Sequence, residues 1–186
     1  DVALVYRASA EPAERAAAAV RALGRRPHTL RADLADPLDC SATVNEVAAI
    51  FGRLDVVVNM ASHYQPVLFD QLDAAQWDRQ MAVDLRAAFL VSKAAVPHLR
   101  GAGGGRIINL TDWIAASARP RYLGYLPYYV AKAGVKALTE ALALELAAGE
   151  SPLAAEVPDR DGFLDSLGDL LDVHGLEQEI VGAALV

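Results

Sequence analysis

An α/β domain with a parallel β-sheet is the fold class that this sequence predicts. Short apolar, β-branched segments alternate four times with segments of helical character between residues 1 and 148. This order is typical of parallel sheets whose helices cover both faces through right-handed crossovers. The chain has 186 residues, of which 54% are hydrophobic, and this suffices for the core of one domain. We therefore expect a single domain over residues 1–186, in which residues 149–186 form a divergent C-terminal portion.

Three strands and two helices are expected in the first third of the chain. The run Val2–Tyr6 is apolar and β-branched, as in a buried strand. Ser9 is placed to cap the alanine-rich helix that follows, and Gly24 is placed to end it. The strand that ends at Asn59 has the clearest pattern of the three. The predicted ranges are 2–6, 28–34 and 54–59 for the strands, and 11–23 and 41–51 for the helices.

A fourth strand and two longer helices are expected in the next part of the chain. Pro97 marks the point at which the first of these helices would break, because proline removes a helical hydrogen bond. Beyond Gly149 the pattern weakens into a loop and two further helical stretches. The predicted ranges are helix 73–99, turn 101–105, strand 106–110, irregular 111–127, helix 128–148, loop 151–161 and helices 162–173 and 176–186.

Charge and residue usage exclude several classes of protein. The net charge of -7 argues against nucleic acid, whose binders present a basic face. No apolar run is long enough to span a membrane and no basic leader precedes Val2, so we expect a cytoplasmic protein. The lone Cys40 excludes an intrachain disulfide. The four histidines are scattered along the chain, so no metal site is expected.

Tyr128 and Lys132 are the first candidates for catalysis. They stand four residues apart at the start of a predicted helix, so their side chains share one face. A phenol has an ordinary pKa of about 10, and a nearby ammonium group favours the phenolate. Such a pair can transfer a proton, an effect of about 100- to 10,000-fold in rate. The same spacing is also common in surface pairs, so the spacing alone does not decide between the two interpretations.

The surrounding sequence supports the catalytic interpretation. Residues 128–146, YYVAKAGVKALTEALALEL, resemble the active-site helix of the short-chain dehydrogenase/reductase family. Residues 1–7 resemble the second strand of that family, and Ala32-Asp33-Leu34 resembles the end of its third. Residues 52–62 resemble its fourth strand and the turn that follows. The resemblance covers about residues 1–146 and implies a Rossmann-like doubly wound sheet, with functional residues beyond the carboxyl ends of its strands.

The resemblance also implies how a nicotinamide cofactor would bind. Lys132 would hold the nicotinamide ribose and lower the pKa of Tyr128, which would act as the general acid or base. Asp33 and Leu34 would flank the adenine ring. The remaining implied contacts are Asn59 and Ala61 on the cofactor floor and Arg7 beside the adenosine ribose. Because an arginine can pair with a 2′-phosphate, NADP(H) is expected in preference to NAD(H), which stays possible.

Asp112 stands where the family usually has a serine, after Asn109-Leu110-Thr111. An aspartate here resembles the pteridine reductase branch, as does Ser62 in place of a glycine. A carboxylate accepts hydrogen bonds from ring N–H groups, which a simple carbonyl substrate does not offer. Alternatively Asp112 caps a turn and Thr111 takes the serine's role. The sequence thus predicts reduction of a small carbonyl or C=N substrate, pterin-like or, as an alternative, a 3-oxoacyl or other ketone.

Two further departures from the family leave alternatives open. Asp84 occupies a position where the family often has an asparagine that holds a water, and it could instead be a carboxylate on the helix surface. No first strand and glycine-rich turn precede Asp1, and no sixth strand is evident after Leu146. A non-catalytic, truncated Rossmann domain that acts as an interaction subunit is therefore an alternative. The apolar helix faces also predict a homo-oligomer, either a dimer or a tetramer.

Overall fold

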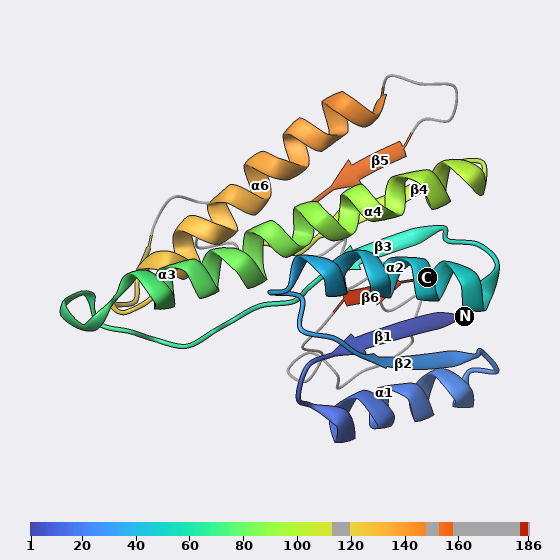
Figure 1. Cartoon of the computed structure of the whole chain (residues 1–186), viewed down its shortest axis with the longest axis horizontal. Coiled ribbons are helices and arrows are strands. Elements are labelled where there is room, and N and C mark those ends of the chain that lie inside the picture. The colour runs from blue at the N-terminus through green and yellow to red at the C-terminus, as the bar shows by residue number, and fades with distance from the viewer. Residues whose placement is uncertain (113–119, 148–152, 158–182, 186) are drawn as a thin grey trace.

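A six-stranded sheet in the order β2-β1-β6-β3-β4-β5 lies at the centre of the protein (Figure 1). The computed structural model describes residues 1–112, 120–147, 153–157 and 183–185. Strand β1 is parallel to β2, and β3, β4 and β5 are parallel to one another. Strand β6 is antiparallel to both of its neighbours, β1 and β3. The strands are β1 (Val2–Tyr6), β2 (Pro27–Arg31), β3 (Val56–Asn59), β4 (Gly105–Asn109), β5 (Leu153–Glu156) and β6 (Ala183–Leu185).

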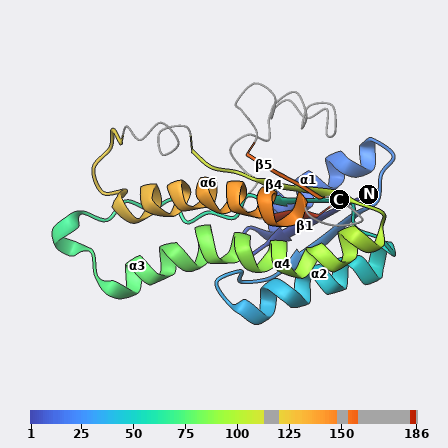
Figure 2. The same ribbon diagram turned by 90° about the horizontal axis from the view of Figure 1, so that it is seen from above.

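Helices cover both faces of this sheet. Helix α1 packs against Val2 and Leu4, whereas α2 and α4 pack against Ala3 and Val5. Successive residues of a strand point to opposite faces, so β1 contributes to both cores. Figure 2 shows α1 on one side of the sheet and α2 and α4 on the other. The helices are α1 (Ala10–Ala22), α2 (Pro37–Phe51), the 3-10 turn η1 (Phe69–Gln71), α3 (Ala74–Met81), the π-helical turn η2 (Ala82–Arg86), α4 (Ala87–Gly101) and α6 (Leu126–Ala147).

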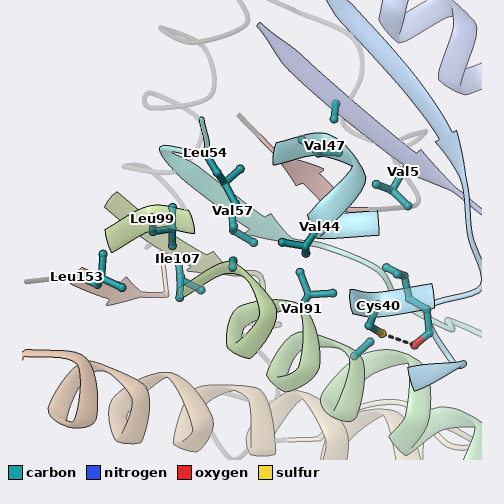
Figure 3. Packing of buried hydrophobic residues seen from close by; sticks show 14 of the residues in the cluster. Val5, Cys40, Val44, Val47, Leu54, Val57, Val91, Leu99, Ile107 and Leu153 are labelled. Carbon is teal, nitrogen blue, oxygen red and sulfur yellow. Dashed lines mark hydrogen bonds between the residues drawn. The ribbon is translucent and has the colours of Figure 1, made fainter. Parts of the chain in front are cut away.

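Helix α2 begins four residues earlier than the sequence predicts. The side chain of Asp36 accepts a hydrogen bond from the N–H of Leu38 at 2.9 Å, and Pro37 occupies the first helical position. Cys40 therefore lies inside the helix and in the core, where its Sγ donates to the carbonyl of Leu34 at 3.3 Å (Figure 3). Burial raises the pKa of this thiol to about 11, so it stays protonated and unreactive at neutral pH.

The second strand ends earlier than predicted, at Arg31. The N–H of Ala32 still donates to the carbonyl of Tyr6 at 2.9 Å, whereas the N–H of Asp33 donates to a side-chain oxygen of Asp39 at 2.8 Å and leaves the ladder. The predicted helix over 73–99 continues through the exposed Pro97 to Gly101, and the predicted break is wrong. Its regular hydrogen bonding changes instead at the π turn η2. Among the described residues, no helix has the length and apolar character that crossing a membrane requires.

The C-terminal portion contributes two strands where none was predicted. Residues 153–156 lie in the predicted loop but form β5, which pairs with β4 in the register Ile107↔Ala155. Residues 183–185 lie in the predicted last helix but form β6. The backbone pairing offered by neighbouring strands outweighs a weak local preference for helix. The helix predicted over 162–173 lies outside the described residues.

Gly105 is required at the start of β4 by the space around it. A Cβ added there would lie 2.5 Å from the carbonyl oxygen of Asp55 and 2.7 Å from a methyl group of Leu99. We expect Gly105→Ala to lower the free energy of unfolding by about 1–3 kcal/mol, measured by urea denaturation. Gly101→Ala is the matched control because its Cβ would meet nothing within 4 Å. Equal stability of the two variants would contradict this account of the packing.

Candidate active site

Four of the predicted cofactor residues line one cavity beyond the carboxyl ends of β1, β2 and β3. The cavity has a volume of about 60 Å³. The sequence-predicted residues Arg7, Asp33, Leu34 and Ala61 all contribute to its wall. This edge of a parallel sheet is where ligands bind in open α/β folds. The other lining residues are Val5, Tyr6, Ala32, Ser62, His63 and Val83.

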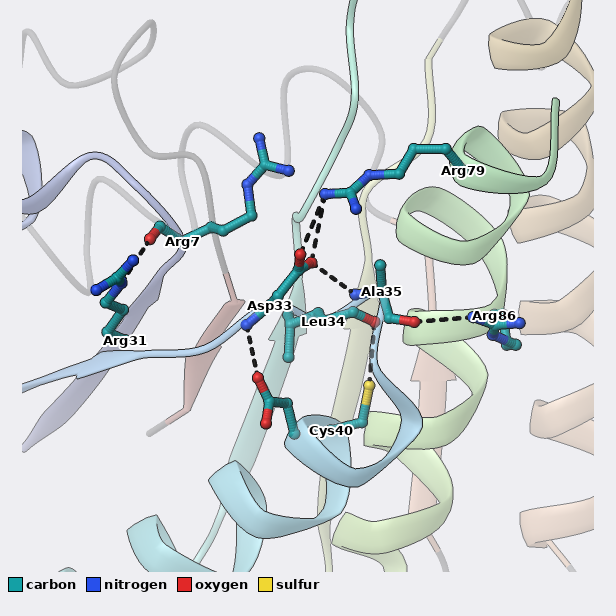
Figure 4. A network of polar contacts seen from close by, with 9 residues as sticks. Arg7, Arg31, Asp33, Leu34, Ala35, Cys40, Arg79 and Arg86 are labelled. Carbon is teal, nitrogen blue, oxygen red and sulfur yellow. Dashed lines mark hydrogen bonds and ion pairs between the residues drawn. The ribbon is translucent and has the colours of Figure 1, made fainter. Parts of the chain in front are cut away.

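Asp33 pairs with one arginine and lies near a second at this cavity. The guanidinium of Arg79, from α3, lies 3.2 Å from its carboxylate, and Figure 4 shows Arg7 approaching from a different side. Burial acts to raise the pKa of Asp33, but the hydrogen bond from the N–H of Ala35 and the charge of Arg79 outweigh it and lower the pKa. The carboxylate is therefore ionised at neutral pH. The sequence did not point to Arg79, which lies 46 residues from Asp33 along the chain.

Asn59 is built into the framework below the site. Its side-chain amide donates to Asn109 at 2.8 Å and to Ser92 at 3.1 Å. Asn109 in turn donates to Thr139 of α6 at 2.9 Å. These buried bonds connect β3, β4, α4 and α6 and fix their relative positions. Asn59 also lines a small cavity together with Lys132, and Leu34 and Ala61 line both this cavity and the first one.

Helix α6 brings Tyr128 and Lys132 to the same buried region. Tyr128 is 7% exposed and Lys132 is 5% exposed. The Nζ of Lys132 donates to the carbonyl of Leu110 at 3.1 Å, lies 3.7 Å from the carboxylate of Asp84, and stands 5.9 Å from the ring centroid of Tyr128. Burial lowers the pKa of Lys132, and the charge of Asp84 opposes this shift. Tyr128 and Lys132 are thus both buried, which excludes their interpretation as a pair on the protein surface.

Asp84 is fully buried, so its interpretation as a surface carboxylate is wrong. The carboxylate accepts hydrogen bonds from the Ser62 hydroxyl at 2.6 Å, the His63 N–H at 2.9 Å and the Gln80 amide at 2.7 Å. With Lys132 as counter-charge, every oxygen has partners, as a buried charge requires. The sequence did not point to Gln80, although its spacing of four residues from Asp84 places both on one side of a helix.

The hydroxyl of Tyr128 donates to the carboxylate of Asp112 at 3.0 Å. Burial raises the pKa of Tyr128. The negative charge of Asp112, the hydrogen bond that Asp112 accepts and the negative charge of Asp84 raise this pKa further. The net shift of the Tyr128 pKa is therefore upward, so the lowering expected from Lys132 does not prevail over burial and the two carboxylates. The phenol of Tyr128 is therefore protonated at neutral pH.

Comparisons with known proteins agree with this geometry. A sequence model described as short chain dehydrogenase matches residues 1–150. The 3-oxoacyl-[acyl-carrier-protein] reductase FabG of Staphylococcus aureus is 32% identical over an alignment of 183 residues that covers 96% of this chain and 72% of the reductase. The chain belongs to the short-chain dehydrogenase/reductase family of oxidoreductases.

Two solved structures of this family resemble the fold closely. A short chain dehydrogenase from Burkholderia cenocepacia in complex with NADP has a TM-score of 0.76 and 34% identity, and covers 83% of this chain. The acetoin dehydrogenase YohF from Salmonella typhimurium has a TM-score of 0.74 and 28% identity, also over 83% of the chain. The chain spans 61% and 60% of those two proteins, about three fifths of their length.

The residues expected at the two ends of a nicotinamide dinucleotide form two groups along this edge of the sheet. Arg7 and Asp33 line the cavity beyond β1 and β2, and Lys132 lies beside Tyr128 on α6. Between them, Ala183 of the antiparallel β6 pairs with Asn59 at the same edge. β6 occupies the position in the sheet between β1 and β3, and because it is antiparallel to them it begins at this edge. Among the described residues, no strand therefore ends here between β1 and β3 and turns into a helix. Such a turn is where the classic fold binds the pyrophosphate.

Replacing Asp112 by asparagine tests what holds the proton on Tyr128. We expect the pKa of Tyr128 to fall in Asp112→Asn. The pKa is measured from the absorbance of the phenolate, with Tyr128→Phe as the reference. The folded-state pKa exceeds the unfolded value of about 10, so Tyr128 stabilises the fold below that pH and the stabilisation is lost as the pH rises through the folded value. Asp112→Asn should therefore lose less stability in alkali. A pKa that shifts no more than in the control Asp78→Asn, at an exposed position of α3, would refute this account.

Proposed function

We propose that this chain forms the catalytic part of an NADP(H)-dependent reductase that converts a small carbonyl or C=N group. One observation carries the proposal: the protonated Tyr128, the buried Lys132 and the Arg7–Asp33 cavity lie along the same edge of the sheet. The names of its relatives, which are reductases and dehydrogenases, support the same reaction type.

The protein's own part in the reaction is the delivery of a proton. The cofactor supplies a hydride when it is bound. Tyr128 gives its phenolic proton to the oxygen or nitrogen that gains charge as the double bond is reduced. The nearby ammonium group of Lys132 stabilises the phenolate that this leaves behind. To reach the substrate, the Tyr128 hydroxyl leaves its hydrogen bond to Asp112, and this bond forms again once the phenolate takes a proton back from water.

Arg7 carries the preference for NADP(H). It lies at the rim of the cavity that would take the adenosine end, where a 2′-phosphate adds two negative charges. Arg79 adds a second guanidinium, 3.2 Å from the carboxylate of Asp33. The NADP found in the related Burkholderia cenocepacia structure is consistent with this choice. NAD(H) is the alternative cofactor, since the rest of the cavity does not depend on the phosphate.

Two substrate types follow from different observations. The relatives named 3-oxoacyl-[acyl-carrier-protein] reductase and acetoin dehydrogenase favour a ketone. The carboxylate of Asp112 at the Tyr128 hydroxyl favours a pterin-like ring, because it can accept hydrogen bonds from the N–H groups of such a ring.

Exposed apolar side chains on α4 and α6, Phe89 and Leu144, are suited to self-association as a homo-oligomer.

The experiment is a turnover assay that follows NADPH oxidation with a ketone and, separately, a dihydropterin. We expect faster turnover with NADPH than with NADH, and a loss of about 100-fold or more in kcat in Tyr128→Phe. Tyr129→Phe, at the next and partly exposed position of α6, is the matched control and should keep its rate. A Tyr128→Phe variant with full activity would exclude the catalytic assignment. The absence of turnover and of cofactor binding in the wild type would favour an interaction subunit instead.

A further inference from the structure

Two loops meet beside the Tyr128 phenol, and each contributes a tyrosine. Tyr64 lies in the loop after β3, and Tyr125 immediately precedes α6. Their rings are stacked, with centroids 4.6 Å apart and planes inclined by 22°. The ring of Tyr128 lies 4.9 Å from that of Tyr64 at 73°, in an edge-to-face arrangement. Three aromatic rings from two segments of the chain therefore converge at the proton donor.

The backbone holds these two loops together. The N–H of Val67 donates to the carbonyl of Gly124 at 2.8 Å. Gly124 has a φ of +84°, and a Cβ added there would lie 3.2 Å from the Cβ of Pro66. Both the left-handed conformation and the close approach favour glycine at this position. Main-chain contacts thus hold together the two loops that carry Tyr64 and Tyr125, and the stack does not depend on side-chain contacts alone.

The stack presents an aromatic surface to solvent. Tyr64 is 56% exposed although it contacts two other rings, whereas Tyr128 beneath it is almost fully buried. Burial raises the pKa of Tyr64, as does its hydrogen bond to Tyr125, so the ring remains a neutral phenol at physiological pH. An exposed, neutral aromatic ring next to a buried reacting group is a surface that gains stability when another flat ring covers it.

We propose that Tyr64 and Tyr125 form an aromatic clamp that selects substrates whose reducible C=O or C=N group is conjugated to a planar ring. This inference rests on the proposed function and names its substrate class. A planar ring stacked against Tyr64 lies next to the ring of Tyr128, so the conjugated group at its edge comes within reach of the phenolic proton. A flexible aliphatic chain cannot stack in this way and gains only from its burial.

The test compares two ketones that differ in planarity, acetophenone and cyclohexyl methyl ketone, which have the same number of carbon atoms. Their dissociation constants for the wild-type chain are measured by ligand-observed NMR, which requires no turnover. We expect acetophenone to bind about 2- to 10-fold more tightly, the range for one added aromatic contact. Tyr64→Leu should abolish this preference, whereas Tyr64→Phe should retain it because the ring is kept. Phe69→Leu, at a 76% exposed aromatic residue five positions further along the chain, is the matched control and should also retain the preference.

Equal affinity of the two ketones for the wild type, or an unchanged preference in Tyr64→Leu with an intact circular dichroism spectrum, would overturn the clamp. The turnover assay separates this result from the fate of the proposed function. Turnover of both ketones without discrimination would leave the reductase and remove the clamp. Preferential binding of acetophenone without any turnover would leave the clamp and remove the reductase.

Discussion

The buried ion pair between Asp84 and Lys132 is the interaction on which the site depends. The two charged groups lie 3.7 Å apart, with side chains 0% and 6% exposed. Removing one partner of such a pair typically costs about 3–5 kcal/mol, because the other charge stays buried without compensation. Asp84 comes from the π turn after α3 and Lys132 comes from α6, while Ser62 of the loop after β3 also donates to the carboxylate. The pair therefore fixes three segments in one arrangement.

This constraint explains the state of the neighbouring phenol. The charge of Lys132 is directed at Asp84 and at the carbonyl of Leu110, so it does not dominate the surroundings of Tyr128. Tyr128 bonds to Asp112 instead and keeps its proton. The same loop that supplies Ser62 continues to Tyr64, whose ring contacts that of Tyr128. The Tyr128 phenol, the Asp84–Lys132 pair and the exposed ring of Tyr64 are thus linked through the loop after β3.

The sequence pattern predicted those helices and strands whose formation depends on residues close by in the chain. Strand β1 has the predicted bounds, and α6 begins within two residues of its predicted start, because apolar periodicity is strong there. Strands β5 and β6 were missed since they depend on sheet edges made by distant segments. The direction of the pKa shift of Tyr128 was also missed. It depends on burial and on carboxylates 16 and 44 positions earlier in the sequence, at Asp112 and Asp84, and no spacing rule connects these residues.

A double-mutant cycle on Asp84 and Lys132 tests the central claim most directly. The free energy of unfolding is measured by urea denaturation for the wild type, Asp84→Asn, Lys132→Met and the double variant. We expect each single variant to lose about 3–5 kcal/mol, and the double variant to lose less than the sum of both by about 2 kcal/mol or more. Losses that simply add would show that the two groups do not stabilise each other, and would contradict the account of the site given above.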